Sequence, residues 1–317
     1  MKKIKEFSYI KVILIISIVC AHLSPINYIT KFNSSISWLY NAIGILGVPI
    51  FYFISGYLFY NNQKKFKDFF VNKIKSIIIP WIFIGTLCYL AVFLLQDNIS
   101  LVGYLNFIIG KGSYLYYLTV LILIYIIVFK YKDNFMFLIL LIIIGIISII
   151  LNIYYGIHEY SYLNIFNWIS YFNIGIIINK YNKLSSLFNF SNKNKYLFLI
   201  SFVLVVVSGL YFNFEVNYWT MIGVLLIITF FFTIFGFIYN ININNNLLTF
   251  IGENSLSFYL IHMPIAGLIV RLTNFNSILL LIRPILTILI TYIVIYLYKI
   301  IVEKIKFRNL KLLIGVK

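Results

Sequence analysis

The chain has 317 residues, of which 62% are hydrophobic and only 10% are charged. Soluble domains carry about 25% charged residues, so this composition excludes an ordinary water-exposed surface and indicates an integral membrane protein. The formal net charge of +17 would suggest a nucleic-acid partner for a soluble protein. Here the basic residues cluster between apolar segments, where they set membrane orientation, so we expect membrane lipids and no nucleic acid as partners.

The apolar segments predict an all-α integral membrane protein with about ten transmembrane helices, because a helix needs about 20 apolar residues to cross a bilayer. We expect the spans at residues 8–25, 37–60, 77–96, 113–130, 134–153, 162–179, 195–213, 217–240, 250–272 and 277–302. The loops between them are short, so we expect a single transmembrane domain over residues 1–317.

The basic residues predict the side of the membrane on which each loop lies. If both termini are cytoplasmic, 21 of the 25 Lys and Arg residues fall in cytoplasmic segments. Loops rich in Lys and Arg stay in the cytoplasm during insertion, so this distribution favours two cytoplasmic termini. The lysines at the N-terminus and the apolar run after them mimic a signal peptide. No small-x-small cleavage site follows, however, so we expect an uncleaved first span.

The first predicted span carries two ionisable residues, Lys11 and His22. Such side chains are costly to bury in a bilayer, so they are candidates for function. They are eleven residues apart, close to a whole number of turns, and therefore share one helix face about 16 Å apart. Imidazole titrates near neutral pH, which makes His22 a candidate catalytic base. An isolated buried histidine could also simply hydrogen-bond a neighbouring helix.

Three segments together resemble the acyltransferase-3 family, whose members are integral membrane enzymes that O-acylate bacterial surface glycans and related acceptors. Lys11 and His22 are similar to the family's Arg/Lys-x10-His signature. The segment that ends in Ser55-Gly56 is similar to its apolar-Phe-Phe-x-x-Ser-Gly segment. Residues 255–262, which end in His262, resemble its late Ser-Leu-x-x-Tyr-Leu-x-His segment. The order and spacing of the three segments extend the resemblance over nearly the whole chain.

The segment before Pro80 departs from the family. Members commonly have Arg-x-x-Arg there, whereas this chain has Lys73 at the first position and Ser76 at the second. Lys75 could substitute, although it lies about 100° away on a different helix face. A Lys also lacks the planar fork with which Arg binds a phosphate through two hydrogen bonds. The departure concerns the donor site more than the class of reaction.

The resemblance implies transfer of an acyl group, most simply acetyl from acetyl-CoA, to a hydroxyl of a cell-surface polysaccharide or its lipid-linked precursor. Lys11, Lys73 and Lys75 would then attract the phosphates of the donor, although lysines at the inner membrane edge also set topology. His22 would activate the acceptor hydroxyl or carry the acyl group briefly. We expect acetyl-CoA as a substrate, no bound metal or redox cofactor, and a location in the bacterial plasma membrane.

Three further residues are candidates for substrate binding. His262 lies about twelve residues into the ninth span, at a depth comparable with His22, where it either orients the site or packs. Ser55 either contacts substrate or bonds a backbone carbonyl. Arg283 lies about two turns below the outer surface, where it either faces a water-filled acceptor cleft or reaches outward. We favour the cleft.

Two other functions fit the same composition. A transporter or exporter of polysaccharide or lipid-linked sugar would also place His22, His262 and Arg283 within the membrane, but it would not consume acetyl-CoA. A non-catalytic scaffold in a glycan-assembly complex predicts no selective defect in His22→Ala. Consumption of acetyl-CoA therefore separates the enzyme from both alternatives.

Overall fold

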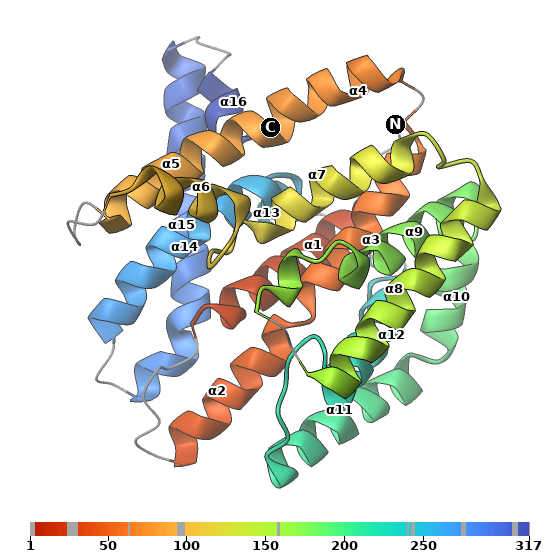
Figure 1. Cartoon of the computed structure of the whole chain (residues 1–317). Helices are drawn as coiled ribbons and strands as arrows, with labels where there is room; N and C mark the ends of the chain where they lie inside the picture. The colour runs from red at the N-terminus through yellow and green to blue at the C-terminus, as the bar shows by residue number, and fades with distance from the viewer. Residues whose placement is uncertain are drawn as a thin grey trace.

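The structure is a computed structural model that describes residues 4–23, 31–62, 64–93, 99–156, 159–239, 241, 245–273, 277–305 and 310–316. These residues form helices and turns and no strand, which confirms the all-α prediction (Figure 1). The elements are α1 Lys5–Ala21, α2 Lys31–Gly44, α3 Gly47–Tyr60, α4 Phe66–Lys73, the π-helix η1 Ile74–Ile78, α5 Ile79–Phe93, α6 Leu101–Ile109, α7 Tyr116–Phe129, α8 Phe135–Tyr155, the short 3-10 helix η2 Ser161–Leu163, α9 Phe166–Lys180, α10 Leu184–Lys193, α11 Lys195–Phe212, α12 Met221–Ile238, α13 Asn246–Glu253, α14 Ser255–Thr273, α15 Ser277–Ile305 and α16 Lys311–Ile314.

Seven helical stretches of the described chain are long and apolar enough to cross a membrane, so the predicted count of about ten is not confirmed. They are Ser34–Tyr60, Phe66–Ala91, Phe135–Tyr155, Lys195–Phe212, Met221–Ile238, Ser255–Thr273 and Leu279–Ile305. The other three predicted spans do form helices, but α1, α7 and α9 have only 17, 14 and 15 residues. At 1.5 Å per residue, such helices are shorter than the roughly 30 Å of the hydrocarbon layer.

The first span is shorter than predicted because α1 ends at Ala21, with His22 as its C-terminal capping residue. Pro25 follows three residues later in the sequence. A proline inside a helix lacks the N–H needed for the backbone ladder, and its ring collides with the carbonyl four residues earlier. Hydropathy alone does not register this limit, so the predicted range 8–25 was too long at its C-terminal end.

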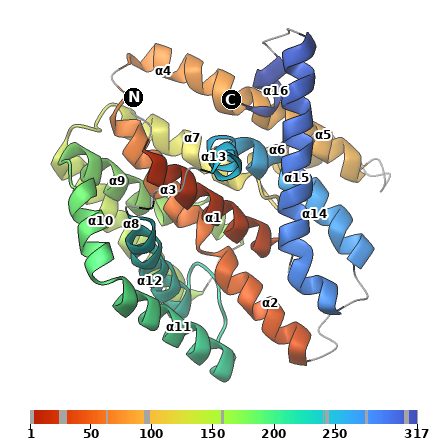
Figure 2. The same ribbon diagram turned by 180° about the vertical axis from the view of Figure 1, so that it is seen from behind.

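Helix α1 lies at the centre of the bundle. It packs against α2, α3, α12, α13, α14 and α15, and Figure 2 shows it crossing the middle of the molecule between the α9–α12 group and α15. Most of its side chains are buried, whereas α11 at the periphery is largely exposed. The apolar character of α1 therefore reflects contact with other helices, while that of α11 suits contact with lipid.

Helices α3 and α9 pack in especially close contact because each presents a glycine to the other. A Cβ atom at Gly56 would lie 1.9 Å from the Phe172 carbonyl oxygen, and one at Gly175 would lie 2.1 Å from the Phe53 carbonyl oxygen. No larger residue fits between backbones at this separation, which is why small residues favour close helix packing in membranes. Because Gly56 holds α3 against α9, the contact also sets the direction in which the neighbouring Ser55 points.

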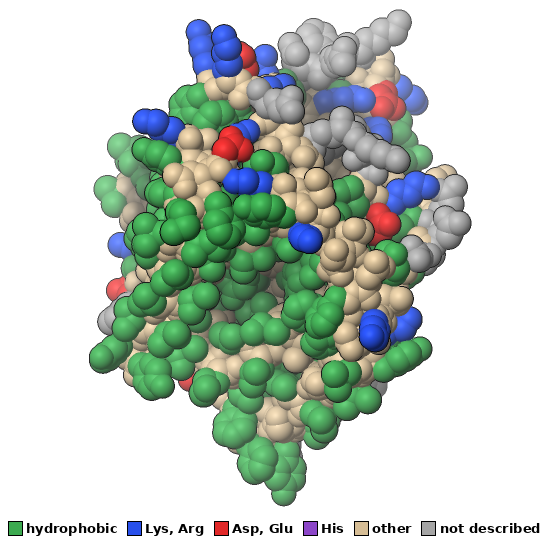
Figure 3. All heavy atoms as spheres, turned by 90° about the vertical axis from the view of Figure 1, so that its right-hand side faces the viewer, with side chains coloured by type: hydrophobic (Ala, Val, Ile, Leu, Met, Phe, Trp, Pro, Cys, Tyr) green, Lys and Arg blue, Asp and Glu red, His purple; other side chains and the backbone are tan. Residues whose placement is uncertain are grey.

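The charged side chains gather toward one end of the molecule. In Figure 3 most Lys and Arg side chains lie in the upper part of the view, and hydrophobic side chains cover the lower part. The labelled chain ends lie at that same end, near α4 (Figure 1). The two termini therefore share one side of the bundle. Their placement in the cytoplasm stays a prediction from the distribution of basic residues.

Candidate active site

One face of α1 runs between two hollows. Lys11 and Ile18 line the first, which we call the inner pocket, and His22 lines the second, which we call the outer cavity. These residues are seven and four positions apart, the spacing that places side chains on one helix face. The face shared by Lys11 and His22, expected from their spacing, thus leads from one hollow to the other.

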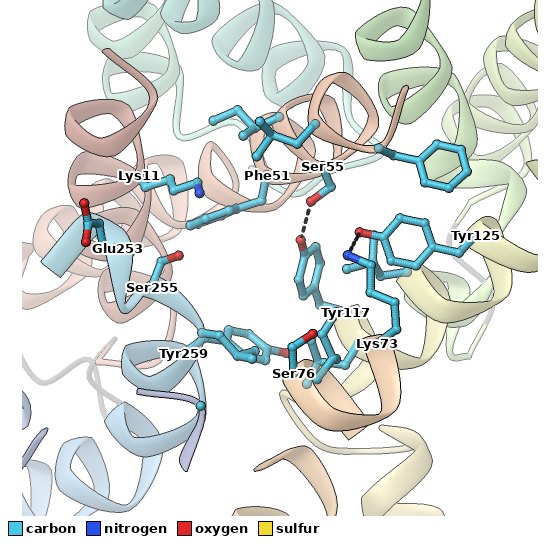
Figure 4. Close-up of a pocket in the computed structure, with 18 of the residues that line it drawn as sticks. Lys11, Phe51, Ser55, Lys73, Ser76, Tyr117, Tyr125, Glu253, Ser255 and Tyr259 are labelled. Carbon is cyan, nitrogen blue, oxygen red and sulfur yellow. Dashed lines mark hydrogen bonds between the residues drawn. The ribbon is translucent and has the colours of Figure 1, made fainter. Parts of the chain in front are cut away.

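The inner pocket has a volume of about 360 Å³ and is formed mainly by α1, α3, α7, α14 and the α4–η1 segment. It contains four of the residues singled out from the sequence, namely Lys11, Ser55, Lys73 and Lys75. In Figure 4, Lys11, Glu253 and Ser255 lie along one side, and Lys73 and Tyr125 lie on the opposite side. Lys311 of α16 is a further lining residue that the sequence reading did not select.

Aromatic rings hold Lys73 in this pocket. Its Nζ donates a hydrogen bond to the Tyr125 hydroxyl at 3.3 Å. The same Nζ lies 4.6 Å from the centre of the Tyr125 ring and 5.2 Å from that of Phe69. A cation over an aromatic face is attracted by the ring quadrupole without losing its charge. No carboxylate of the described residues forms an ion pair with Lys73, so its charge is available to an anionic ligand.

The π-helix η1 explains how Lys73, Lys75 and Ser76 all line the same pocket. The period of a regular α-helix places Lys75 on a different face from Lys73. A π-helix has more residues per turn, so face assignments made with the α-helical period fail across it, and such turns are frequent at functional sites. The chain thus supplies two lysines and a hydroxyl where the family commonly has two arginines.

Ser55 points into the inner pocket from α3. Its hydroxyl lies 3.2 Å from the Tyr117 hydroxyl, and the Tyr52 hydroxyl donates to the Tyr117 carbonyl at 3.2 Å. Figure 4 shows the Ser55–Tyr117 contact in the centre of the pocket. Phenol rings and apolar side chains make up most of the remaining lining.

The outer cavity has a volume of about 630 Å³ and a mostly apolar lining. Tyr114, Tyr116 and Tyr162 contribute rings to it, and Arg271 at the end of α14 is the cation among its described lining residues. The Tyr116 and Tyr162 ring centres are 4.9 Å apart. The Tyr162 hydroxyl accepts a hydrogen bond from the Gly112 N–H at 2.9 Å, which ties η2 to the turn before α7.

His22 lies within a cluster of aromatic rings at the edge of this cavity. Its ring centre is 5.4 Å from that of His262 and 6.4 Å from that of Tyr114. His262 is 1% exposed, and its Nδ1 lies 2.7 Å from the Tyr259 carbonyl oxygen and 3.2 Å from that of Phe258. The two histidine rings therefore lie next to each other, in agreement with the comparable depths expected for them.

Two tyrosines separate the inner pocket from the outer cavity. Tyr259 lines the first and Tyr114 lines the second, with ring centres 5.7 Å apart. The Tyr259 hydroxyl donates to the Tyr114 carbonyl, and the Tyr114 hydroxyl donates to the Leu260 carbonyl at 2.8 Å. The Tyr114–Tyr259 contact therefore lies between a residue of the inner pocket and a residue of the outer cavity.

Comparison with known families identifies the chemistry that such a site serves. A family model described as an acyltransferase domain, of the acyltransferase-3 family, matches residues 4–299. The chain belongs to the acyltransferase-3 family. No curated protein and no solved structure matches it. The resemblance inferred from the three motifs is thereby confirmed, and the protein is a multi-pass membrane acyltransferase that transfers groups other than aminoacyl groups.

Arg283 of this acyltransferase does not occupy the place expected of it. Its side chain is 1% exposed and is not among the residues that line the two hollows. Its Nε donates to the Thr273 hydroxyl at 2.7 Å and its Nη2 to the Thr273 carbonyl at 3.1 Å. A buried guanidinium needs such acceptors, and the last residue of α14 supplies them. Arg283 thus joins α14 to α15, and Arg271 takes the expected position at the cavity.

The other residues missed from sequence are the tyrosines of the outer cavity. Tyr114, Tyr116 and Tyr162 precede or begin helices, where an aromatic residue ordinarily reads as part of the interfacial belt. The chain has 27 tyrosines, so a single tyrosine carries little information by itself. The feature of the sequence that could have located these tyrosines is the pair of glycines Gly110 and Gly112, which predicts a turn before α7. Both glycines have positive φ in the structure.

Proposed function

We propose that this membrane acyltransferase moves an acetyl group from acetyl-CoA to a hydroxyl of a cell-surface polysaccharide or its lipid-linked precursor, in a bacterial plasma membrane. The observation that carries the proposal is the single α1 face that joins a lysine-lined pocket to a cavity with an imidazole at its edge. Family membership supports the acyl transfer. The donor and the acceptor are those that the family resemblance implies, and the linings of the two hollows are compatible with them.

The inner pocket suits coenzyme A because it combines lysines with phenol rings and apolar side chains. Lys11, Lys73, Lys75 and Lys311 line the pocket together with one carboxylate, that of Glu253, among the described lining residues. Lys311 is already paired with Glu303 at 2.9 Å, so Lys11, Lys73 and Lys75 carry the proposed donor contacts. Lysines bind phosphate as point charges, which fits a donor with several phosphates at one end. The phenol rings and apolar side chains around Ser55 suit the less polar arm that carries the thioester.

His22 suits the proton transfer that the reaction needs. The hydroxyl of the acceptor gives its proton to a ring nitrogen of His22 as its oxygen attacks the thioester carbonyl. The carbon–sulfur bond then breaks, and the thiolate of coenzyme A takes the proton from the imidazolium as it leaves. The products are an O-acetyl ester and the free thiol, and His22 returns to its neutral form.

Three tyrosines of the outer cavity suit it to the sugar ring of the acceptor. Tyr114, Tyr116 and Tyr162 offer ring faces on which the C–H face of a sugar can stack, and Ser113 adds a polar group. Its volume of about 630 Å³ falls in the range of small-molecule sites. Arg271 would meet the phosphate of a lipid-linked acceptor. The acetyl end of the donor reaches this cavity when the Tyr114–Tyr259 contact opens.

The experiment follows the label of radioactive acetyl-CoA. The purified protein in lipid nanodiscs is mixed with labelled acetyl-CoA and surface glycan isolated from the host strain. We expect label in the glycan, released by mild alkali as an ester, together with one free thiol for each acetyl group transferred. If the protein consumes no acetyl-CoA, but carries lipid-linked sugar across a proteoliposome membrane, the transporter hypothesis replaces the enzyme.

A further inference from the structure

The hydrogen bonds of His262 determine which of its nitrogens carries the proton. Its Nδ1 lies 2.7 Å from the Tyr259 carbonyl oxygen and 3.2 Å from the Phe258 carbonyl oxygen. A carbonyl oxygen only accepts hydrogen bonds, so Nδ1 must be the donor. In a neutral imidazole the other nitrogen is then an acceptor. The Nε2 atom of His262 therefore carries a lone pair, and the attachment of the side chain to α14 fixes the direction of that lone pair.

That lone pair has no hydrogen-bond partner among the described residues, although the atom is buried. Buried acceptors are nearly always paired, so this one calls for an explanation. Tyr114 and Tyr259 pack against the His262 ring, with centres 5.6 and 6.0 Å away. Their single hydroxyl hydrogens are already donated to the carbonyls of Leu260 and Tyr114. Neither phenol is free to donate to Nε2.

The remaining ring neighbour is His22, whose centre lies 5.4 Å from that of His262 at a tilt of 41°. The imidazole of His22 has an N–H in its neutral form and two in its charged form. Its ring borders the outer cavity rather than being packed on all sides, so a rotation about its side-chain bonds can turn an N–H toward His262. Catalytic hydrogen bonds often close in this way only when substrate is bound.

We infer that His262 is a positioning residue whose Nε2 accepts the N–H of His22. This inference rests on the proposed function, in which His22 is the base. The bond fixes the tautomer of His22 and leaves its other nitrogen unprotonated toward the outer cavity. When that nitrogen takes the proton of the acceptor hydroxyl, the N–H shared with His262 stays in place and stabilises the imidazolium. His262 itself neither gains nor loses a proton.

Two substitutions of His262 test the roles of its two ring nitrogens separately. In His262→Asn the amide keeps a donor for the Tyr259 carbonyl but leaves nothing at the position of Nε2. In His262→Gln the longer side chain places an amide oxygen near Nε2. Partners that orient a functional imidazole typically matter by about 10–100-fold. We expect His262→Asn to lower kcat by that factor, with KM for both substrates unchanged, and His262→Gln to stay within about fivefold of wild type.

A spectroscopic measurement tests the same inference without turnover. The chain has three histidines, so ¹⁵N-histidine labelling of wild type, His22→Gln and His262→Gln assigns all the ring signals. We expect His262 to show the proton on Nδ1, and its Nε2 signal to move in His22→Gln, where the proposed donor is lost. A proton on Nε2 of His262 would overturn the inference, whatever the activity of the preparation.

The kinetic outcomes distinguish this inference from the proposed function. If His22→Gln is inactive and His262→Asn has the wild-type kcat, His262 does not position the base, and only this inference fails. If His262→Asn and His262→Gln are equally impaired with raised KM values, the residue serves packing, and the inference also fails. If His22→Gln itself transfers acetyl at the wild-type rate, the proposed function fails first.

Discussion

The inner pocket and the outer cavity differ in how they would recognise their ligands. The inner pocket is lined by four lysines, whereas the outer cavity is lined mainly by aromatic and apolar side chains with Arg271 at its edge. Charge attracts a ligand from a distance and weakens with salt, while ring stacking acts only on contact. A donor with several phosphates and an acceptor with sugar rings therefore fit opposite ends of the α1 face. His22 lines the outer cavity at the end of the α1 face that also carries Lys11, where the proposed transfer brings donor and acceptor together.

Loss of His22 should have the largest effect of any substitution in either region. We expect His22→Gln to lower kcat by about 10²–10⁴-fold, because a general base contributes that much to a proton transfer. The KM for acetyl-CoA should stay unchanged, since the lysines of the inner pocket are untouched. The measurement is release of free thiol by protein in nanodiscs, with His158→Gln as the matched substitution elsewhere in the chain.

The pH dependence of acetyl transfer should also show that His22 acts as a base. Imidazolium has no lone pair with which to take a proton. Wild-type activity should therefore fall as the pH is lowered and recover as it is raised. Residual activity of His22→Gln should lack this acidic limb. A well-folded His22→Gln protein with wild-type turnover at neutral pH would remove His22 from the mechanism.

Helix packing should matter more behind the inner pocket than at the outer cavity, and two glycines test this. A Cβ atom at Gly56 would lie 1.9 Å from the Phe172 carbonyl oxygen, whereas one at Gly267 meets nothing within 4 Å. Overpacking a tight contact typically costs about 1–3 kcal/mol. We expect Gly56→Ala to lower thermal stability clearly and Gly267→Ala to leave it unchanged. Equal melting temperatures for the two variants would contradict the close packing of α3 on α9.

Charge removal should act on the donor alone. The double variant Lys11→Ala/Lys73→Ala should raise the KM for acetyl-CoA by on the order of 30-fold, since each lysine near a cluster of anions contributes about 1 kcal/mol. The difference from wild type should shrink as salt rises, because added ions screen the attraction. Lys195→Ala is the control, because Lys195 bonds Asn192 and does not line the pocket. An unchanged KM in the double variant would leave these lysines with a topological role only.

The inner pocket was largely predictable from sequence, for a physical reason. In an apolar span each charged residue has a cost and therefore an explanation, so Lys11 drew attention by its type. Lys73 and Lys75 drew attention because they occupy the segment where the family commonly has Arg-x-x-Arg. The helix face on which Lys73 and Lys75 lie was harder to predict. The π-helix η1 changes the helical period between Lys73 and Ser76, and nothing in the residue types there announces it.

The outer cavity was mostly hidden, because its tyrosines are abundant elsewhere and its shape depends on turns between distant helices. Arg283 illustrates the remaining error. Depth and charge alone suggested a cleft, but a hydrogen-bonding partner on another helix, Thr273, determines where a buried guanidinium lies. The predicted count of about ten spans is not confirmed for a related reason. Hydropathy measures apolar length, and the buried α1 and α9 are apolar because they contact protein.

The smallest expected effect is the one specific to the acceptor side. Tyr162 contributes a ring to the outer cavity and stacks near Tyr116, while its hydroxyl accepts the Gly112 N–H. Tyr162→Phe removes the hydroxyl and keeps the ring, and Tyr162→Leu removes the aromatic face but keeps an apolar side chain. An aromatic contact contributes about 1 kcal/mol, or about fivefold. Tyr162→Leu should therefore raise the KM for the glycan by about that factor, with the KM for acetyl-CoA unchanged. Tyr162→Phe keeps the ring, so its KM values for the donor and the acceptor should match those of wild type. If Tyr162→Leu instead raised the KM for acetyl-CoA, the donor would extend into the outer cavity, and the assignment of one hollow to each substrate would be wrong.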